Sequence, residues 1–258
     1  MKLTARQGRG LRLTEAGQRL VAHAHRIFAD LEEAQADLAS LARGASGTLR
    51  LGAFPTAAHA LVPRLIEVCQ QQYPALRITV QEHEADHSIP ALRAGELDAA
   101  LVYQYDVLPE YDDPAVELTA LFDDPMLIAL PPNHPAAGPE VHLVKLRDET
   151  WIAPREDSIC RAAVLRACEL AGVTPRFEFA TGDYAVTLAL VQAGLGVAFV
   201  PQLALAPLVT TAELFPVADL RPKRRISLAI RSGSAQHPDM AALADALGHV
   251  AQPFLRTA

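Results

Sequence analysis

An order of strands and helices that occurs twice constrains the fold of this chain most strongly. The first copy runs through residues 49–104 as LRLGAF, LVPRLIEVCQQQ, LRITVQE, IPALRAGEL and AALVYQ. The second copy runs through residues 150–201 as TWIA, CRAAVLRACELAG, RFEFAT, YAVTLALVQAG and GVAFVP. In both copies apolar strands alternate with amphipathic helices, which is typical of βαβ units and a parallel sheet. We therefore predict an α/β fold with two similar Rossmann-like lobes.

Turn-forming residues stand at matching places in the two copies. Pro74 and Pro175 each precede the second strand, and Gly95 and Gly194 each follow an alanine at the end of a helix, with about one hundred residues between the members of each pair. A glycine at the end of a helix suits a left-handed cap, which other residues rarely adopt. The shared positions favour a repeated unit over a chance likeness.

Two segments outside the copies are predicted to cross between the lobes, near residues 118–132 and 215–232. This connectivity predicts that lobe I contains residues 48–121 and 227–258 and that lobe II contains residues 122–226. A last helix, from about Asp239 to Leu255, is expected to return to lobe I. Two crossovers make a hinge, so a ligand-binding cleft is expected between the lobes.

A long amphipathic helix is predicted over residues 14–43, ahead of the lobes, with Thr14 as its N-cap. From Ala16 to Leu41 its apolar residues recur at spacings of three and four, which is a heptad-like stripe. A stripe this narrow on a helix this long needs a partner, either the body of the protein or a second copy. The polar character of the other faces favours a second copy. The residues expected to form this dimer contact are Leu20, Ile27, Leu31 and Leu38.

The charge of the chain is uneven. Residues 1–26 hold six basic residues against one acidic residue, Glu15, although the whole chain has a net charge of −7. A basic N-terminal segment on an otherwise acidic chain is typical of an end that faces nucleic acid. A basic terminus that is simply solvated explains the same charge distribution equally well. No apolar run approaches the roughly 18 residues of a membrane span, and the basic terminus lacks the apolar segment of a secretory signal. Three cysteines in 258 residues suggest reduced thiols in a cytoplasm.

Polar residues follow the strands in matching loops of both copies. Ligands of open α/β sheets lie at the carboxyl ends of strands, beside the free N–H groups of helix N-termini. For Thr56 and Ser158, a role as helix N-cap is as well supported as a role in ligand binding, and the two roles are compatible. For Asp183, a role as N-cap is favoured over ligand contact. The residues predicted to bind a small polar effector are Thr56, Ala57, Ala58, Tyr103, Gln104, Tyr105, Arg155, Ser158, Asp183, Tyr184 and Pro201.

Known catalytic and cofactor motifs are absent from the sequence, so no cofactor and no metal are expected. There is no GxSxG, HExxH, P-loop or GxGxxG at a helix start. His83 and His87 flank acidic residues that could hold a metal, but a solvated loop is favoured. Cys160 and Cys168 stand over two turns apart on one predicted helix, too far apart for a disulfide without unwinding. Buried, apolar cysteines are favoured there over a thiol sensor, and Trp151 is expected in the core of lobe II.

Several landmarks, taken in order, resemble the LysR-type transcription regulators. GRGLRLTEAGQRLVAHAHRIFADLEEAQADL is similar to the end of their wing and their linker helix, and LRLGAFPTAAHALVPRLIEVCQQQYPALRITVQE to the start of their effector-binding domain. RAGELDAALVY, PMLIALPPNHP and VQAGLGVAFVP match later landmarks. The resemblance implies a fold like the type II periplasmic binding proteins and a helix-mediated homodimer or tetramer. It also implies an effector contacted by residues such as Thr56, Ala57 and Tyr103.

The resemblance begins only at the wing of the family's winged helix-turn-helix, so residues 1–13 are interpreted as a remnant of that domain. Members of the family bind DNA through a recognition helix, and the resemblance found in this sequence does not include that helix. Arg9 and Arg12 are expected to contact DNA phosphates, which position a protein without specifying a sequence. This polypeptide alone is therefore not expected to recognise a DNA sequence.

Two other functions fit a two-lobed chain. One is a periplasmic-type solute-binding protein without a role in transcription, and the other is an α/β enzyme. The dimer-type helix and the lack of a secretory signal argue against the first. The lack of a nucleophile–base or metal set argues against the second.

Overall fold

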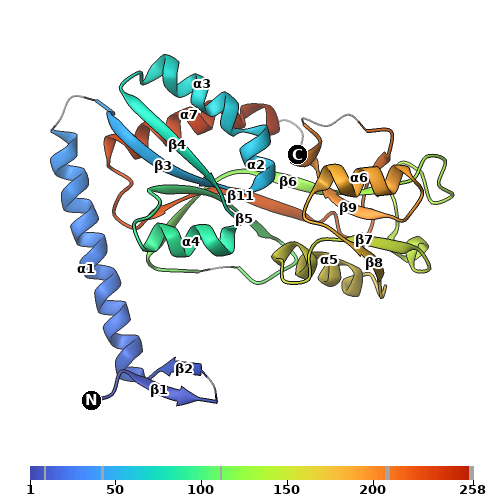
Figure 1. Cartoon of the computed structure of the whole chain (residues 1–258), viewed down its shortest axis with the longest axis horizontal. Coiled ribbons are helices and arrows are strands. Elements are labelled where there is room, and N and C mark those ends of the chain that lie inside the picture. The colour runs from blue at the N-terminus through green and yellow to red at the C-terminus, as the bar shows by residue number, and fades with distance from the viewer. Residues whose placement is uncertain (9, 42–43, 111, 207–209, 256–258) are drawn as a thin grey trace.

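The chain forms a two-lobed body with a long helix that extends from one end, in the computed structural model of residues 1–8, 10–41, 44–110, 112–206 and 210–255 (Figure 1). We use lobe I for the strands β3, β4, β5 and β11, the first half of β6, and the helices around them. Its elements are β3 (Gly47–Ala53), α2 (Pro55–Ala60), α3 (Val62–Gln72), β4 (Leu76–Glu82), α4 (Ala85–Arg93), β5 (Ala99–Tyr105), β6 (Val116–Leu130), β11 (Lys223–Arg231) and α7 (Pro238–Leu255).

Lobe II, the name used here for the second half of β6 and the elements from residue 143 to residue 216, repeats the arrangement of lobe I. In lobe I, β3 lies between the parallel strands β4 and β5. In lobe II, β7 pairs in parallel with β8, and a parallel bridge from Trp151 to Val197 links β7 to the segment leading into β9. The predicted repeat is thereby confirmed. Its elements are η1 (Leu143–Leu146), β7 (Thr150–Ala153), α5 (Ile159–Leu170), β8 (Arg176–Ala180), α6 (Tyr184–Gln192), β9 (Ala198–Pro201), η2 (Gln202–Leu205) and β10 (Glu213–Pro216).

The strands β6 and β11 connect the lobes. β11 pairs antiparallel with β5 and with β6 from Val116 to Pro125, within lobe I. From Met126 onward β6 pairs instead with β9 and β10, within lobe II. The predicted boundary between residues 121 and 122 remains a prediction, and the change of pairing partner lies a few residues beyond it.

Local sequence signals determine where the helices begin and end. Thr14 Oγ1 accepts a hydrogen bond from the N–H of Gly17 at 3.1 Å, so the predicted N-cap of α1 (Glu15–Ser40) is confirmed. Gly95 and Gly194 have φ of +72° and +75°, as the predicted left-handed caps require. The segment predicted to be a loop after β3 instead contains the short helix α2. Pro55 in its first turn has a φ suited to a helix, which explains the difference.

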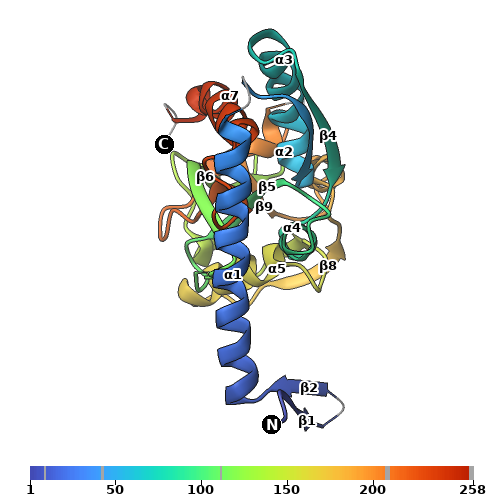
Figure 2. The ribbon, with the colours of Figure 1, turned by 90° about the vertical axis from the view of Figure 1, so that its left-hand side faces the viewer.

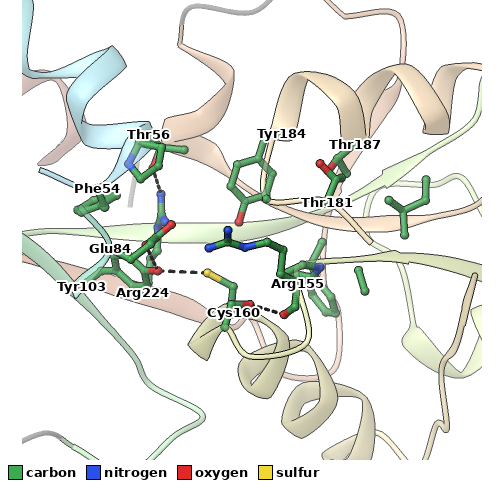
Figure 3. A pocket seen from close by; sticks show the side chains of 17 residues that line it. Phe54, Thr56, Glu84, Tyr103, Arg155, Cys160, Thr181, Tyr184, Thr187 and Arg224 are labelled. Carbon is green, nitrogen blue, oxygen red and sulfur yellow. Dashed lines mark hydrogen bonds between the residues drawn. The ribbon is translucent and has the colours of Figure 1, made fainter. Parts of the chain in front are cut away.

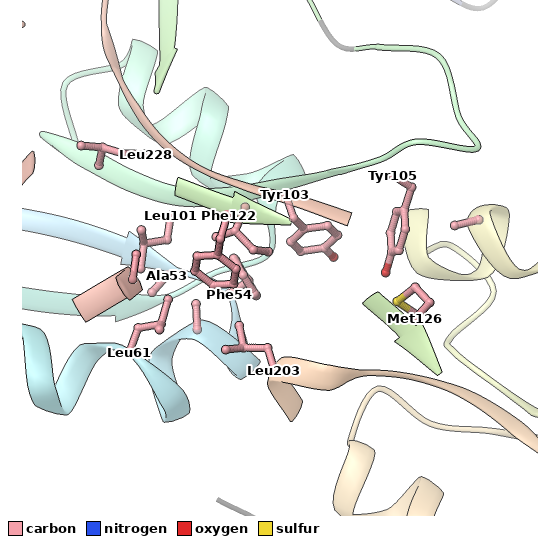
Figure 4. Close-up of a cluster of buried hydrophobic side chains, with 14 of the residues drawn as sticks. Ala53, Phe54, Leu61, Leu101, Tyr103, Tyr105, Phe122, Met126, Leu203 and Leu228 are labelled. Carbon is pink, nitrogen blue, oxygen red and sulfur yellow. The ribbon is translucent and has the colours of Figure 1, made fainter. Parts of the chain in front are cut away.

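Apolar residues of both sheets and their helices form the core. α7 packs on α3 and β6, which confirms the expected return of the last helix to lobe I. Trp151 is completely buried in lobe II, as predicted, and its indole N–H donates to the carbonyl of Leu146 at 3.3 Å. Figure 4 shows the part of the core near the crossover, where Phe54 and Tyr103 lie edge to face with ring centres 4.7 Å apart.

The helix α1 lies along one end of lobe I, and the strands β1 (Thr4–Gln7) and β2 (Gly10–Leu13) form a hairpin at its far end (Figure 2). Glu32 accepts an ion-paired hydrogen bond from Arg231 of β11 at 2.6 Å. A side chain at Gly233 would collide with the backbone of Ala29, so this glycine lets α1 approach the body. None of the described helices has both the length and the apolar character needed to cross a lipid bilayer.

Candidate functional site

A cavity lies between the two lobes, near the crossover strands (Figure 3). Its volume is about 40 Å³. A water molecule needs about 10–15 Å³ of such volume, so the cavity has room for roughly three. Lobe I contributes Phe54, Pro55, Thr56, Glu84, Tyr103 and Arg224, and lobe II contributes Ile152, Ala153, Pro154, Arg155, Ser158, Cys160, Thr181, Gly182, Tyr184, Thr187 and Phe199.

The fold brings these residues together because the parallel strands of each lobe end at the cavity. Thr56 follows β3, and Arg155 and Ser158 follow the equivalent strand β7. Tyr103 lies near the end of β5. This is the strand-end placement expected for ligand sites in α/β sheets.

A buried ion pair joins the two sides of the crossover. Arg224 and Asp124 side chains are each 2% exposed, and the guanidinium Nε lies 2.8 Å from the carboxylate Oδ2. Arg224 also donates to Thr56 Oγ1 at 2.7 Å, while Asp124 accepts from the backbone N–H of Leu203 at 2.8 Å. Burial raises the pKa of Asp124 above its usual value, and the charge of Arg224 opposes that rise. The hydrogen bond from Leu203 of lobe II to Asp124 therefore ties the ion pair of lobe I to lobe II at this point.

Aromatic rings surround the Arg224 guanidinium and limit its movement. Its central carbon lies 5.1 Å from the centre of the Phe54 ring and 5.0 Å from that of Tyr103, within the range of cation–π attraction. Arginine keeps its proton in proteins, so this charge is permanent. Arg155, in contrast, extends into the cavity from the lobe II side (Figure 3).

The Cys160 thiol lies in the cavity, which corrects the expectation of a buried, apolar cysteine. Cys160 is the second residue of α5 and is only partly buried, and its Sγ lies 3.2 Å from the hydroxyl oxygen of Tyr103. The hydroxyl of Tyr103 donates to Glu84 Oε2 at 2.8 Å. Cys168, further along the same helix, is buried as expected, and burial raises the pKa of its thiol to about 12.

Five of the eleven residues predicted to contact the effector line the cavity, and six do not. The five are Thr56, Tyr103, Arg155, Ser158 and Tyr184. Ser158 is also the N-cap of α5, accepting from the N–H of Arg161 at 3.2 Å, whereas Thr56 is no cap and accepts from Arg224 instead. The residues outside the lining are Ala57, Ala58, Gln104, Tyr105, Asp183 and Pro201.

Local geometry explains the positions of these six residues. Ala57 is completely buried and Ala58 packs against the same core, because both lie on the inner side of α2. Gln104 follows Tyr103 on a strand, so its side chain projects from the opposite face. Tyr105 is buried near Met126 (Figure 4), Pro201 pairs with Met126 in the sheet, and Asp183 caps α6 by accepting from Ala185 N–H at 2.8 Å.

Sequence reasoning missed Glu84, Cys160 and Arg224 as cavity residues. Glu84 is the residue before α4, and Arg224 begins the apolar run of β11 within the basic segment RPKRRIS. A charged residue at the start of an apolar strand was the one available signal for Arg224. Of the two arginines assigned to DNA phosphates, Arg12 is exposed on β2, and Arg9 lies outside the described residues.

Within the described ranges, no group of three His, Cys, Asp or Glu side chains is arranged to hold a metal ion. His83 Nε2 lies 3.1 Å from Gln81 Oε1, and His87 Nδ1 lies 2.8 Å from Asp86 Oδ1, both on the surface. The cavity lining instead offers a thiol, phenols, one carboxylate and guanidinium groups.

Comparisons with known proteins identify a matching family model and similar sequences. The family model described as "LysR substrate binding domain" matches residues 42–252. A Mycobacterium avium protein named "Probable hydrogen peroxide-inducible genes activator" is 30% identical over 256 residues, covering 96% of this chain and 80% of that protein.

Solved structures share the fold. A variant of OxyR from Corynebacterium glutamicum with H2O2 bound has a TM-score of 0.72 and 24% identity, covering 99% of this chain and 80% of that one. The BenM effector-binding domain with its effector benzoate has a TM-score of 0.69 and 24% identity, covering 80% of this chain and 93% of that one.

Proposed function

Because this chain belongs to the LysR family of transcription regulators, we propose that its interlobe cavity senses a small peroxide through the Cys160 thiol and changes the arrangement of the lobes. The observation that carries the proposal is the position of Cys160 Sγ, in the cavity and 3.2 Å from a hydroxyl of the opposite lobe. A chemical change at this sulfur alters a contact between the lobes directly.

The size of the cavity supports a small reactant. Room for about three water molecules suits hydrogen peroxide better than an aromatic or sugar ligand in this arrangement of the lobes. The Mycobacterium avium relative is named "Probable hydrogen peroxide-inducible genes activator", and the structurally similar OxyR variant has H2O2 bound. Both support the same class of effector.

The reaction is a two-electron oxidation of the thiol. The Cys160 sulfur attacks one oxygen of hydrogen peroxide, the O–O bond breaks, and the second oxygen leaves with the bonding pair and takes up the thiol proton as water. The product is a sulfenic acid. The added oxygen lies where Tyr103 now contacts the sulfur, so the product favours a different separation of the lobes.

Hydrogen exchange tests the proposal. After treatment with a stoichiometric amount of hydrogen peroxide, we expect altered exchange in β5 and α5, which carry the contacting residues Tyr103 and Cys160. The strands β1 and β2 serve as an internal control, because they lie at the far end of α1, away from β5 and α5 (Figure 1). Unchanged exchange in β5 and α5 after complete oxidation of the thiol would contradict the proposal.

A second candidate effector is a small carboxylate. Arg155 and Ser158 line the cavity beside the N-terminus of α5, where free N–H groups favour an anion, and Thr56 adds a hydroxyl. Glu84 opposes an anion in the same cavity, and Asp124 already neutralises Arg224. The BenM domain, which shares the fold, has benzoate as its effector.

Calorimetry with a carboxylate found by a thermal-shift screen tests this second candidate. Thr56→Val keeps the side-chain volume but removes the hydroxyl, and Arg155→Ala removes the free charge, so each should weaken binding by about 1–3 kcal/mol. Arg166→Ala, which alters an exposed ion pair on the outside of α5, is the matched control. Equal affinity in all three variants would mean that the carboxylate binds elsewhere.

We also propose that α1 joins two copies of the chain. The apolar stripe of α1 remains exposed in one chain: Leu20, Ile27, Leu31 and Leu38 are 50%, 65%, 53% and 68% exposed. The opposite side of the helix packs on lobe I through Ala36 and the Glu32–Arg231 pair. Two such stripes would bury each other and leave the β1–β2 hairpins, with Arg12, available for DNA phosphates.

Charges in this stripe are expected to dissociate the dimer. Leu20, Ile27 and Leu31 replaced together by Asp would place like charges in an apolar seam, and we expect light scattering to report mainly monomer. The other faces of α1 already carry the acidic residues Glu15, Asp30 and Asp37. Arg26→Asp, which adds an acidic residue outside the apolar stripe, is therefore the control. A triple variant that remains as dimeric as the parent would show that the contact lies elsewhere.

The remaining assignments extend from the family. The relatives are transcription regulators, and we propose the same role for this chain, in the cytoplasm, with the lobe boundaries given above. An effector that prefers one arrangement of the lobes would then move α1 relative to its partner and so reorient a DNA-binding head.

A further inference from the structure

The hydrogen bonds around Cys160 form a chain that crosses the cavity and ends at the Glu84 carboxylate. Tyr103 has one phenolic proton, which it donates to Glu84 Oε2 at 2.8 Å. The contact of 3.2 Å between Tyr103 Oη and Cys160 Sγ must therefore have the thiol as donor. The atoms are thus already ordered as S–H to phenol oxygen and phenol O–H to carboxylate (Figure 3).

From this order we propose that Tyr103 relays the Cys160 proton to the Glu84 carboxylate on the opposite side of the cavity and that the two residues return it to the leaving group. The inference rests on the proposed reaction of Cys160 and assigns positioning roles to two residues of the opposite lobe. As the thiol proton moves to Tyr103 Oη, the phenol proton moves to Glu84. The thiolate attacks the peroxide, the O–O bond breaks, and the proton held by Glu84 returns through Tyr103 to the departing hydroxide, giving water.

The surrounding structure holds both relay groups in place. Tyr103 pairs with Ile226 in the sheet, and its ring is fixed against Phe54. Glu84 precedes α4, and its backbone carbonyl accepts from the N–H groups of His87 and Ser88 at 3.0 and 2.9 Å. Burial raises the pKa of Tyr103, so the phenol passes one proton while it accepts another and never stays ionised.

The other groups around Cys160 offer no equivalent route. Tyr105 is buried and Tyr184 is partly buried, and desolvation raises the pKa of both phenols. The Tyr105 hydroxyl has no hydrogen-bond partner among the described residues. Arg224 carries a permanent charge and is paired with Asp124. Arg155 lines the cavity but is a donor only. Glu84 is therefore the carboxylate that is connected to the thiol by hydrogen bonds.

The rate at which iodoacetamide alkylates Cys160, measured across pH by peptide mass spectrometry, tests the relay. Iodide leaves without a proton, so this rate reports removal of the thiol proton independently of peroxide. We expect Tyr103→Phe and Glu84→Gln each to slow alkylation at neutral pH by roughly 100-fold or more, the scale of a positioned general base.

Tyr73→Phe is the matched control, because the Tyr73 hydroxyl donates to the Asp245 carboxylate at 2.9 Å outside the cavity. Glu84→Gln keeps a hydrogen-bond acceptor for Tyr103, so the fold is retained and the proton acceptor alone is lost. Faster or unchanged alkylation in Glu84→Gln would overturn the relay, since it would show that Glu84 acts only as a repelling charge. If the variants slow alkylation but wild-type Cys160 resists peroxide, the relay stands and the peroxide function fails.

Discussion

Replacing Arg224 with methionine should lower the free energy of unfolding by about 3–5 kcal/mol, the usual cost of leaving one member of a buried ion pair alone. Asp124 would remain 2% exposed without its guanidinium partner, and Thr56 Oγ1 would lose its donor. Urea unfolding monitored by circular dichroism measures the change. Through hydrogen bonds to Thr56 and Leu203, the pair connects α2, β6, β11 and η2. Few other single substitutions should therefore lower the free energy of unfolding as much.

The neighbour Arg225 supplies the control. It lies on the same strand, is half exposed and pairs with Asp123 at 3.4 Å, so Arg225→Met should change stability by less than about 1 kcal/mol. Adding Asp124→Leu to Arg224→Met should restore much of the loss, because an apolar pair replaces a buried charge. Equal stabilities of the Arg224 and Arg225 variants would contradict this account of the crossover.

The dependence of the Arg224→Met defect on pH has a definite sign. Burial already raises the pKa of Asp124, and the variant removes the charge that opposes this rise. A folded-state pKa above the unfolded value means that folding is favoured when the group is protonated. The defect should therefore shrink as pH falls through the acidic range and be largest at neutral pH.

The second large effect concerns the response to peroxide. Cys160→Ser should abolish the change of hydrogen exchange in β5 and α5, because a hydroxyl keeps the contact to Tyr103 but is not oxidised by peroxide. Cys168→Ser should retain the change, since the Cys168 thiol is buried and its pKa is raised to about 12, which leaves almost no thiolate at neutral pH. The same response in Cys160→Ser would place the sensing chemistry at another residue.

The lobes could be predicted because their signals are local. Each strand and helix of the repeat is encoded by its own apolar period, and the Gly95 and Gly194 caps by a residue type suited to positive φ. The pairing of the lobes through β6 and β11 followed from the two segments left over between the copies. α2 was missed because it is only six residues long and its helical turn depends on Pro55 at its start.

The site was predicted only in part because its chemistry depends on contacts between distant segments. Thr56 and Arg155 follow strands and Tyr103 lies near the end of one, so the strand-end rule could locate them. Arg224 meets Thr56 across 168 residues of sequence, and Cys160 meets Tyr103 across 57. Neither contact has a local signal. The burial of Cys160 was misjudged for the same reason, since the first turn of α5 faces the opposite lobe rather than its own core.

Trapping of sulfenic acid with dimedone, followed by peptide mass spectrometry, tests the central claim most directly. After brief exposure of the reduced protein to stoichiometric hydrogen peroxide, the account predicts dimedone on Cys160 and not on the buried thiols Cys69 and Cys168. Denatured protein serves as the control, in which the three thiols should react alike. Label on Cys69 or Cys168 with Cys160 unmodified, or equal labelling of all three in the native protein, would contradict the claim that the interlobe cavity is a peroxide-sensing site.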